Sequence, residues 1–211
     1  MARGRFIAFE GGEGSGKSTQ ARLLADALAA RGFAIELTRE PGGTPGAEAI
    51  RGLLLDPPGE GWGAQAEALL FAAARADHVA RRIRPALDAG RWVVCDRFVD
   101  SSRAYQGGAG GVGDNAVRAL HAIGSGGLRP DLTLLIAIDP GLAAERLEVR
   151  DGGAADAIGG RGQSYHGKVA EAFARFAEDE SASIVTIDGS GSPDEVHTRV
   201  LEALAPLIGS V

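Results

Sequence analysis

The chain has 211 residues, of which 45% are hydrophobic and 24% charged, with a formal net charge of −6 at pH 7 and a pI near 5.3. Such a composition predicts an ordinary globular domain with a substantial core, and the acidic balance argues against a surface that binds nucleic acid or an anionic membrane. The one cysteine, Cys95, excludes an intrachain disulfide, and no apolar run is long enough for a signal peptide or a membrane span. We therefore expect a cytoplasmic protein with one domain over residues 1–211.

Short apolar runs alternate with helical patterns along the chain. Strands are predicted at residues 6–9, 33–38, 91–95, 132–138 and 183–187. Helices are predicted at about 17–31, 46–55, 62–89, 114–124, 140–150, 164–180 and 193–208. This alternation predicts an α/β fold of three layers, in which helices cover both faces of a five-stranded parallel sheet. Ligands bind beyond the carboxyl ends of such strands, so each loop that follows a strand is a candidate for the site.

The loop after the first strand fits G-x-x-x-x-G-K-[ST], the phosphate-binding P-loop, and it lies between a strand and a helix as that motif requires. The candidate ATP- and phosphate-binding residues are Gly11, Gly12, Glu13, Gly14, Ser15, Gly16, Lys17, Ser18 and Thr19. We expect Lys17 to reach the β- and γ-phosphates as a catalytic cation, and the Ser18 hydroxyl to bind Mg²⁺. A carboxylate beside a triphosphate is unfavourable, so Glu13 is expected to face a second ligand instead.

Two charged residues follow the third predicted strand. A carboxylate at the position of Asp96 can organise Mg²⁺ in a P-loop protein, usually through water. Arg97 can pair with phosphate oxygens through its planar guanidinium group, which makes both residues catalytic candidates. The alternative is an ion pair on the surface.

Two faces separate within the predicted helix 62–89. A buried stripe is predicted at five apolar positions, Leu69, Ala72, Ala76, Val79 and Ile83. Phe71, Arg75 and His78 share another face, where an aromatic ring beside a guanidinium group would suit a planar base. The pattern alone favours a plainer reading, in which Phe71 is a second core contact and Arg75 is solvated. His78 is expected to be structural or exposed.

Two later segments are candidates for closing over a ligand. The polar stretch 100–107 offers Ser102, Tyr105 and Gln106 as hydrogen-bonding groups, although its composition fits a surface loop equally well. The segment 150–163 is rich in glycine and alanine and contains Arg150 and Arg161, so it is expected to be a mobile lid or a plain flexible loop. Arginines that converge on a P-loop favour phosphoryl transfer, because that chemistry needs positioning and charge neutralisation above all.

Five motifs in order resemble those of the bacterial thymidylate kinases, and together they span nearly the whole chain. They are FEGGEGSGKST at 9–19, TREPGGT at 38–44, LFAAARADH at 70–78, CDRFVDSSRAYQG at 95–107 and RPDLT at 129–133. The resemblance implies a P-loop kinase that transfers the γ-phosphoryl group of ATP to dTMP, giving dTDP and ADP. It also implies Mg²⁺ as a cofactor, with Ser18 and Asp96 nearest to the metal, and a homodimer.

The same resemblance implies a role for each residue of the dTMP site. Those residues are Glu13, Arg51, Phe71, Arg75, Arg97, Ser102, Tyr105 and Gln106. Glu13 would bind the 3′-hydroxyl of the deoxyribose, and Arg51 and Arg97 would clamp the acceptor phosphate. Phe71 would stack on thymine, while Arg75, Ser102 and Gln106 would contact its edge. Tyr105 would crowd the 2′ position and disfavour ribonucleotides.

The lid departs from the family pattern. It reads Asp156-Ala157-Ile158, where bacterial relatives usually carry an arginine in the middle position. Such a group is worth about 10³ or more in rate in a P-loop kinase, so we expect a slowed enzyme unless Arg146, Arg150 or Arg161 substitutes. Two other functions stay open at this point: a kinase for another nucleoside monophosphate, and a regulatory module that binds ATP and hydrolyses little of it.

Overall fold

The computed structural model of the chain describes residues 3–151 and 156–209, with residues 150 and 151 described by their backbone only. Its sheet is formed by β1 (Phe6–Glu10), β2 (Ile35–Arg39), β3 (Trp92–Asp96), β4 (Leu132–Ala137) and β5 (Ile184–Asp188). All pair in parallel, in the order β2-β3-β1-β4-β5. The predicted strands are confirmed. β2 begins later than expected because the Phe33 N–H still closes the end of the preceding helix, at 3.2 Å from the Leu28 carbonyl oxygen.

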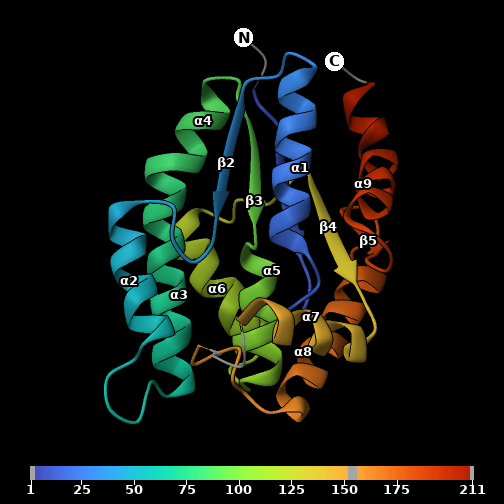
Figure 1. Cartoon of the computed structure of the whole chain (residues 1–211). Coiled ribbons are helices and arrows are strands. Elements are labelled where there is room, and N and C mark those ends of the chain that lie inside the picture. The colour runs from blue at the N-terminus through green and yellow to red at the C-terminus, as the bar shows by residue number, and fades with distance from the viewer. Residues whose placement is uncertain (1–2, 152–155, 210–211) are drawn as a thin grey trace.

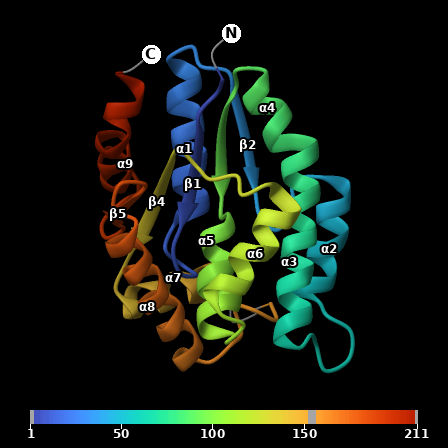
Figure 2. The same ribbon diagram turned by 180° about the vertical axis from the view of Figure 1, so that it is seen from behind.

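Helices cover both faces of the sheet, which confirms the predicted three-layer α/β/α fold (Figures 1 and 2). One face packs against α1 (Lys17–Ala30) and α9 (Pro193–Ile208). The buried residues of that layer include Ile7, Phe9, Leu24, Leu28, Val94, Leu134, Val200 and Leu204. The opposite face packs against η1 (Val79–Ile83) and α4 (Arg84–Asp88), with α8 (Gln163–Asp179) over the β4 and β5 side. No helix in the described residues is long and apolar enough to cross a bilayer.

The predicted helix 62–89 is present as three joined pieces, α3 (Ala64–His78), the π-helical η1 and α4. Pro85 explains the break, because proline has no N–H to donate and its ring crowds the carbonyl four residues earlier. The predicted buried stripe is wrong in its first part: the side chain of Leu69 is 56% exposed, and Ala72 and Ala76 are only half-buried. Val79 and Ile83 are buried as expected.

The segment 100–107 is not a surface loop. It forms α5 (Val99–Ser102) and the π-helical η2 (Arg103–Ala109), and its polar side chains are almost fully buried. Asp100 accepts hydrogen bonds from Arg103 and Arg129, each at 2.8 Å, and Arg103 also pairs with Glu180 at 2.8 Å. These ion pairs satisfy the buried charges and fix the segment against α8.

The remaining helices are α2 (Pro45–Leu55), α6 (Asp114–Ser125) and α7 (Pro140–Asp151). Thr44 caps α2, since its hydroxyl oxygen accepts the Ala47 N–H at 3.3 Å, and α2 packs beside α3. The parallel strands β1, β2 and β3 are neighbours in the sheet and end at the same edge, so the loops that follow them meet in one place.

Candidate active site

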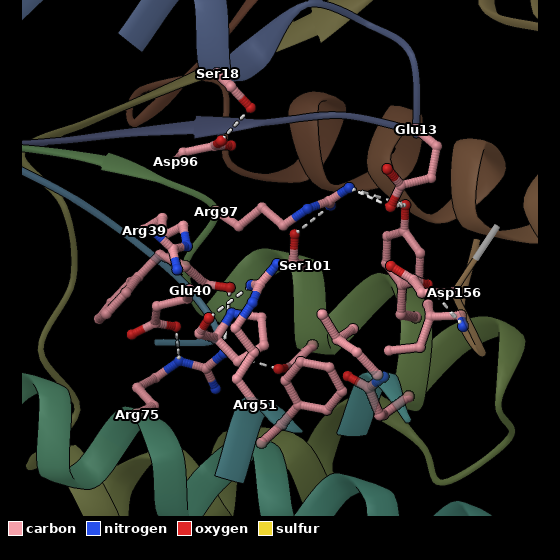
Figure 3. A pocket seen from close by; sticks show the side chains of 18 residues that line it. Glu13, Ser18, Arg39, Glu40, Arg51, Arg75, Asp96, Arg97, Ser101 and Asp156 are labelled. Carbon is pink, nitrogen blue, oxygen red and sulfur yellow. Dashed lines mark hydrogen bonds and ion pairs between the residues drawn. The ribbon is translucent and has the colours of Figure 1, made fainter. Parts of the chain in front are cut away.

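A cavity of about 280 Å³ lies beyond the carboxyl ends of the three neighbouring strands (Figure 3). Its walls come from the P-loop, the loops after β2 and β3, the helical segments α2, α3, α5 and η2, and the segment after residue 155. All eight residues predicted for the dTMP site line it: Glu13, Arg51, Phe71, Arg75, Arg97, Ser102, Tyr105 and Gln106. Residues from distant parts of the sequence therefore converge as one site.

The P-loop folds around its own lysine. The Lys17 Nζ atom donates to the Gly12 carbonyl oxygen at 2.5 Å and to the Ser15 Oγ atom at 3.2 Å. Gly11 has a φ of +139°, and a side chain there would collide with the Ile136 carbonyl, so glycine is required at this position. Burial, together with the nearby positive charge of Arg97, lowers the pKa of Lys17 to about 8. The ammonium group thus sits in the ring of backbone where phosphate oxygens would bind.

Ser18 and Asp96 meet at the start of α1. The Ser18 hydroxyl donates to the Asp96 Oδ2 atom at 2.5 Å, while the buried Oδ1 atom has no hydrogen-bond partner. A hydroxyl beside a carboxylate with a spare lone pair suits Mg²⁺, which prefers oxygen ligands and keeps several waters. Within the described residues no group of three or more His, Cys, Asp and Glu side chains gathers as a metal cluster. These two residues therefore fit a magnesium ion that takes its remaining ligands from phosphates and water.

Arg97 is the one non-glycine residue in the described ranges 3–151 and 156–209 with a positive φ, and its value of +69° lies in the left-handed region. Its Nη2 atom donates to the Glu13 Oε1 atom at 2.6 Å, and its Nη1 atom donates to the Ser101 Oγ atom at 3.0 Å. Burial alone would lower the pKa of Arg97, but the charges of Glu13 and Tyr105 raise it above its ordinary value. Glu13 and Arg97 point toward each other across the cavity (Figure 3), so the surface ion pair considered for Asp96 and Arg97 is not formed.

Arg75 is almost fully buried at the far end of the cavity, so its reading as a solvated residue is wrong. Its Nε atom donates to the Glu40 Oε2 atom at 2.7 Å, and its Nη2 atom donates to the Ser102 Oγ atom at 2.8 Å. Glu40 also contacts the Nδ1 atom of His78 at 3.0 Å, and the other ring nitrogen lies 2.7 Å from the Thr38 hydroxyl. His78 is thus structural, one of the two expected outcomes.

Burial alone would raise the pKa of Glu40, but the charge of Arg75 and the hydrogen bond from His78 hold it below its ordinary value. Glu40 is therefore an anion that orients the guanidinium group of Arg75. The Nη1 atom of Arg75 hydrogen-bonds nothing in the part of the chain that is described.

Three further side chains line the cavity. Phe71 is half-buried and both packs against the core and lines the cavity, so its two expected roles are compatible. The Gln106 Nε2 atom donates to the Glu67 Oε1 atom at 2.9 Å, which leaves the buried Oε1 atom of Gln106 without a partner. The Tyr105 hydroxyl lies 3.4 Å from both Arg97 and Glu13. The lining of the cavity thus includes an unpaired donor on Arg75 and an unpaired acceptor on Gln106, together with the ring of Phe71.

Arg51 reaches the cavity from α2 and donates to the Pro41 carbonyl oxygen at 2.8 Å. Burial and the positive charge of neighbouring Arg39 lower its pKa. Sequence reasoning named neither Arg39 nor the other lining residues Glu40, Ser101 and Asp156 as site residues. The position of Arg39 and Glu40 could have indicated them, because they begin the loop after a predicted strand.

The structure does not bring Arg161 to the P-loop. Its guanidinium group is ion-paired with Glu67 and donates to the Tyr165 hydroxyl at 2.7 Å. Arg161 and Ala157 line a second cavity of about 300 Å³, beside the turn between α2 and α3. The side chain of Arg150 lies outside the described residues. Arg146 donates from α7 to the carbonyl oxygens of Gly189 and Gly191, both at 3.2 Å.

Comparisons with known proteins agree with this geometry. The sequence model of the thymidylate kinase family matches residues 9–200. A thymidylate kinase from Rhizorhabdus wittichii is 60% identical over 97% of the chain and 99% of its own length, and one from Bradyrhizobium diazoefficiens is 49% identical over 96% and 89%. The crystal structure of thymidylate kinase from Ehrlichia chaffeensis superposes with a TM-score of 0.77 at 30% identity, and the match covers 96% of this chain and 99% of that one.

Proposed function

The chain belongs to the thymidylate kinase family and transfers the γ-phosphoryl group of ATP to dTMP, and we propose that the 280 Å³ cavity is where dTMP binds. The observation that carries this proposal is the arrangement of charge along the cavity. Arg97 lies beside the P-loop, where it is ion-paired with Glu13, and Arg51 lines the same cavity from α2, while Arg75 lies farther from the P-loop and is hydrogen-bonded to Ser102. A nucleoside monophosphate needs that order: phosphate, sugar, base.

The hydrogen-bonding groups of Arg75 and Gln106 are complementary to thymine, and Arg97 beside the P-loop is complementary to the phosphate group. Thymine presents a carbonyl acceptor at O4 and a donor at N3–H. The unpaired Nη1 donor of Arg75 and the unpaired Oε1 acceptor of Gln106 are complementary to that edge. Cytosine presents the reverse pattern and would leave both groups buried and unpaired. Adenine shares the reversed pattern of cytosine, so this edge argues against a kinase for cytidine or adenosine monophosphate. A regulatory module would need no base pocket.

Transfer between the two nucleotides requires alignment more than acid–base chemistry. An oxygen of the dTMP phosphate is already anionic at neutral pH, so it can attack the γ-phosphorus as the bond to the β–γ bridging oxygen breaks and ADP leaves. Arg97 and Arg51 hold the acceptor phosphate in line, and Lys17 neutralises charge on the transferring group. Glu13 accepts the 3′-hydroxyl, and Tyr105 fills the space of a 2′-hydroxyl. For the adenine of ATP, we propose the loop after β5, which Arg146 joins to α7.

The cofactor that fits is Mg²⁺, held by Ser18 with Asp96 beside it. When bound, the ion would neutralise the negative charge that develops during phosphoryl transfer. Residues 150–163 are proposed as the lid of one domain that spans residues 1–211.

We also propose that the enzyme is a homodimer in the cytoplasm. Three large apolar side chains are exposed on α2, α3 and α6, which pack side by side: Leu53 (44%), Leu69 (56%) and Ile123 (84%). Exposed apolar side chains on adjoining helices favour a protein interface. The free, buried Cys95 agrees with a reducing compartment.

The roles in the base pocket are tested with Arg75→Ala. Removing this donor should raise the KM for dTMP at least ten-fold, because a buried thymine carbonyl loses a charged hydrogen bond. The KM for ATP should not change. Arg118→Ala, which removes an exposed arginine outside the cavity, is the matched control. An unchanged KM for dTMP in a folded Arg75→Ala enzyme would contradict the thymine assignment.

A further inference from the structure

A fully buried carboxyl group lies between the P-loop strand and the turn that carries Arg97, and the chemistry above does not use it. Glu10 is the last residue of β1 and has no exposed surface. Its Oε1 atom accepts the N–H groups of Phe98 and Ser101 at 2.8 and 2.9 Å. Its Oε2 atom accepts the Ser101 hydroxyl at 2.5 Å. One side chain therefore satisfies the backbone donors at the start of α5, as a cap would.

Hydrogen bonds to two neighbouring residues of β1, Phe9 and Glu10, hold the backbone on both sides of Arg97. The left-handed conformation of Arg97 is unfavourable for a residue with a side chain, so the surroundings must hold it. Before it, the Arg97 N–H donates to the Phe9 carbonyl oxygen at 2.9 Å. After it, the Phe98 N–H donates to Glu10.

A second connection runs through side chains. The Arg97 Nη1 atom donates to the Ser101 hydroxyl oxygen at 3.0 Å, and that hydroxyl donates its own hydrogen to Glu10. The direction of this relay depends on Glu10 being an acceptor at both oxygens. A protonated carboxyl has one O–H to place and would compete with the three donors that now point at it.

We propose that ionised Glu10 is a positioning residue for Arg97, and that protonation of Glu10 loosens the grip of Arg97 on the acceptor phosphate. This inference rests on the proposed role of Arg97 as a phosphate clamp. Glu10 itself touches neither nucleotide and acts through the turn 97–101.

The buried surroundings of Glu10 put this protonation in the neutral range. Burial, aided by the negative charge of Asp100, raises the pKa of Glu10 to about 7, against the opposing effects of the Ser101 hydrogen bond and the Arg97 charge. The other titratable groups that interact with it are Lys17, Cys95 and Tyr105. Asp100 is ion-paired with Arg103 and Arg129.

The sign of the stability effect is opposite to that of the activity effect. A carboxyl whose pKa is higher in the folded state than the unfolded value near 4.5 stabilises the fold below that value, and this stabilisation is lost as pH rises through about 7. Glu10→Gln, which mimics the neutral form, should therefore keep its melting temperature at pH 8. If Glu10 only supported the fold, Glu10→Gln would instead lower the melting temperature at pH 8.

The test compares wild type with Glu10→Gln by kcat/KM for dTMP between pH 5.5 and 9. We expect the wild type to exceed the variant about ten-fold above pH 8, and the ratio to fall toward one below pH 6. Ionisation of dTMP itself cancels in this ratio. Asp131→Asn is the matched control, since Asp131 likewise accepts a backbone N–H, from Phe6 at 2.8 Å, but at the opposite end of β1. Its ratio should stay at one throughout. A ratio for Glu10→Gln that is near one at pH 8, or equal at all pH values, overturns the proposal.

Two more variants keep the inference decidable. Ser101→Ala leaves Glu10 and both backbone hydrogen bonds in place, and should lower kcat/KM about three-fold at pH 8 and not at pH 6; no loss at pH 8 counts against the relay.

Arg97→Ala distinguishes a failure of the positioning role of Glu10 from a failure of the proposed phosphate clamp. If Arg97→Ala impairs dTMP use and Glu10→Gln does not, the positioning role fails; if Arg97→Ala has no effect, the proposed phosphate clamp fails.

Discussion

The buried pair of Glu40 and Arg75 should support both the fold and the base pocket. Both side chains are 3% exposed, and Glu40 is shared with His78, which has no exposed surface. Glu40→Gln keeps the shape of the side chain and removes its charge. The guanidinium group of Arg75 would then be a buried cation without its counter-ion.

The size of the effect follows from that burial. Removing one partner of a buried ion pair costs about 3–5 kcal/mol, and the lower end applies here because glutamine still accepts one hydrogen bond. For a chain of this length, about 3 kcal/mol corresponds to a fall in melting temperature of roughly 6–12 °C. The Nη1 donor of Arg75 would also lose its fixed direction, so the KM for dTMP should rise several-fold while the KM for ATP holds.

Circular dichroism measures the thermal unfolding, and Arg118→Ala, at a side chain 57% exposed, should shift the stability by no more than about 0.5 kcal/mol. The pH dependence supplies a second check. Because the pKa of Glu40 is lowered in the fold, its contribution is complete at pH 7 and is lost as pH falls below about 4.5. A loss under about 1 kcal/mol at pH 7, with an unchanged KM for dTMP, would refute this reasoning.

Three further predictions address the other parts of the site. Ala157→Arg should raise kcat, because Arg161 is held by Glu67 away from the P-loop; an unchanged kcat in steady-state assays would mean that another cation already serves. Tyr105→Ala should lower the preference for dTMP over its ribonucleotide analogue about ten-fold in kcat/KM. An equal preference in the wild type and the variant would contradict the proposed steric role of Tyr105. The pKa of Lys17 is lowered to about 8, so ATP binding at pH 8.5 should take up protons. Calorimetry in two buffers of different ionisation enthalpy measures this uptake, and buffer-independent heats would argue against it.

Much of the fold was predictable because its signals are local. The apolar strands, the P-loop glycines and the loops that follow each strand are written in consecutive residues, and the parallel sheet then forces these loops together. That is why all eight predicted dTMP residues line one cavity.

The wrong predictions concern which side of a helix is buried against a neighbouring element. Periodicity places Leu69 and Arg75 on different sides of α3, but the burial of a side depends on the element packed against it. The polar face is buried because Glu40 neutralises Arg75 there. Glu10 and Glu40 were not recognised as buried anions, because their partners lie 35 or more residues away in the sequence. The partner of Arg161, Glu67, is also far away in the sequence. The sequence therefore did not indicate that this pairing holds Arg161 away from the P-loop, and Arg161 was predicted to be catalytic.

The most direct test of the central claim follows ADP formation with ATP, Mg²⁺ and a panel of nucleoside monophosphates. We predict that dTMP gives the highest kcat/KM of the panel, and that mass spectrometry identifies dTDP as the product. An absence of turnover with dTMP, or faster turnover of CMP or AMP, would contradict the account.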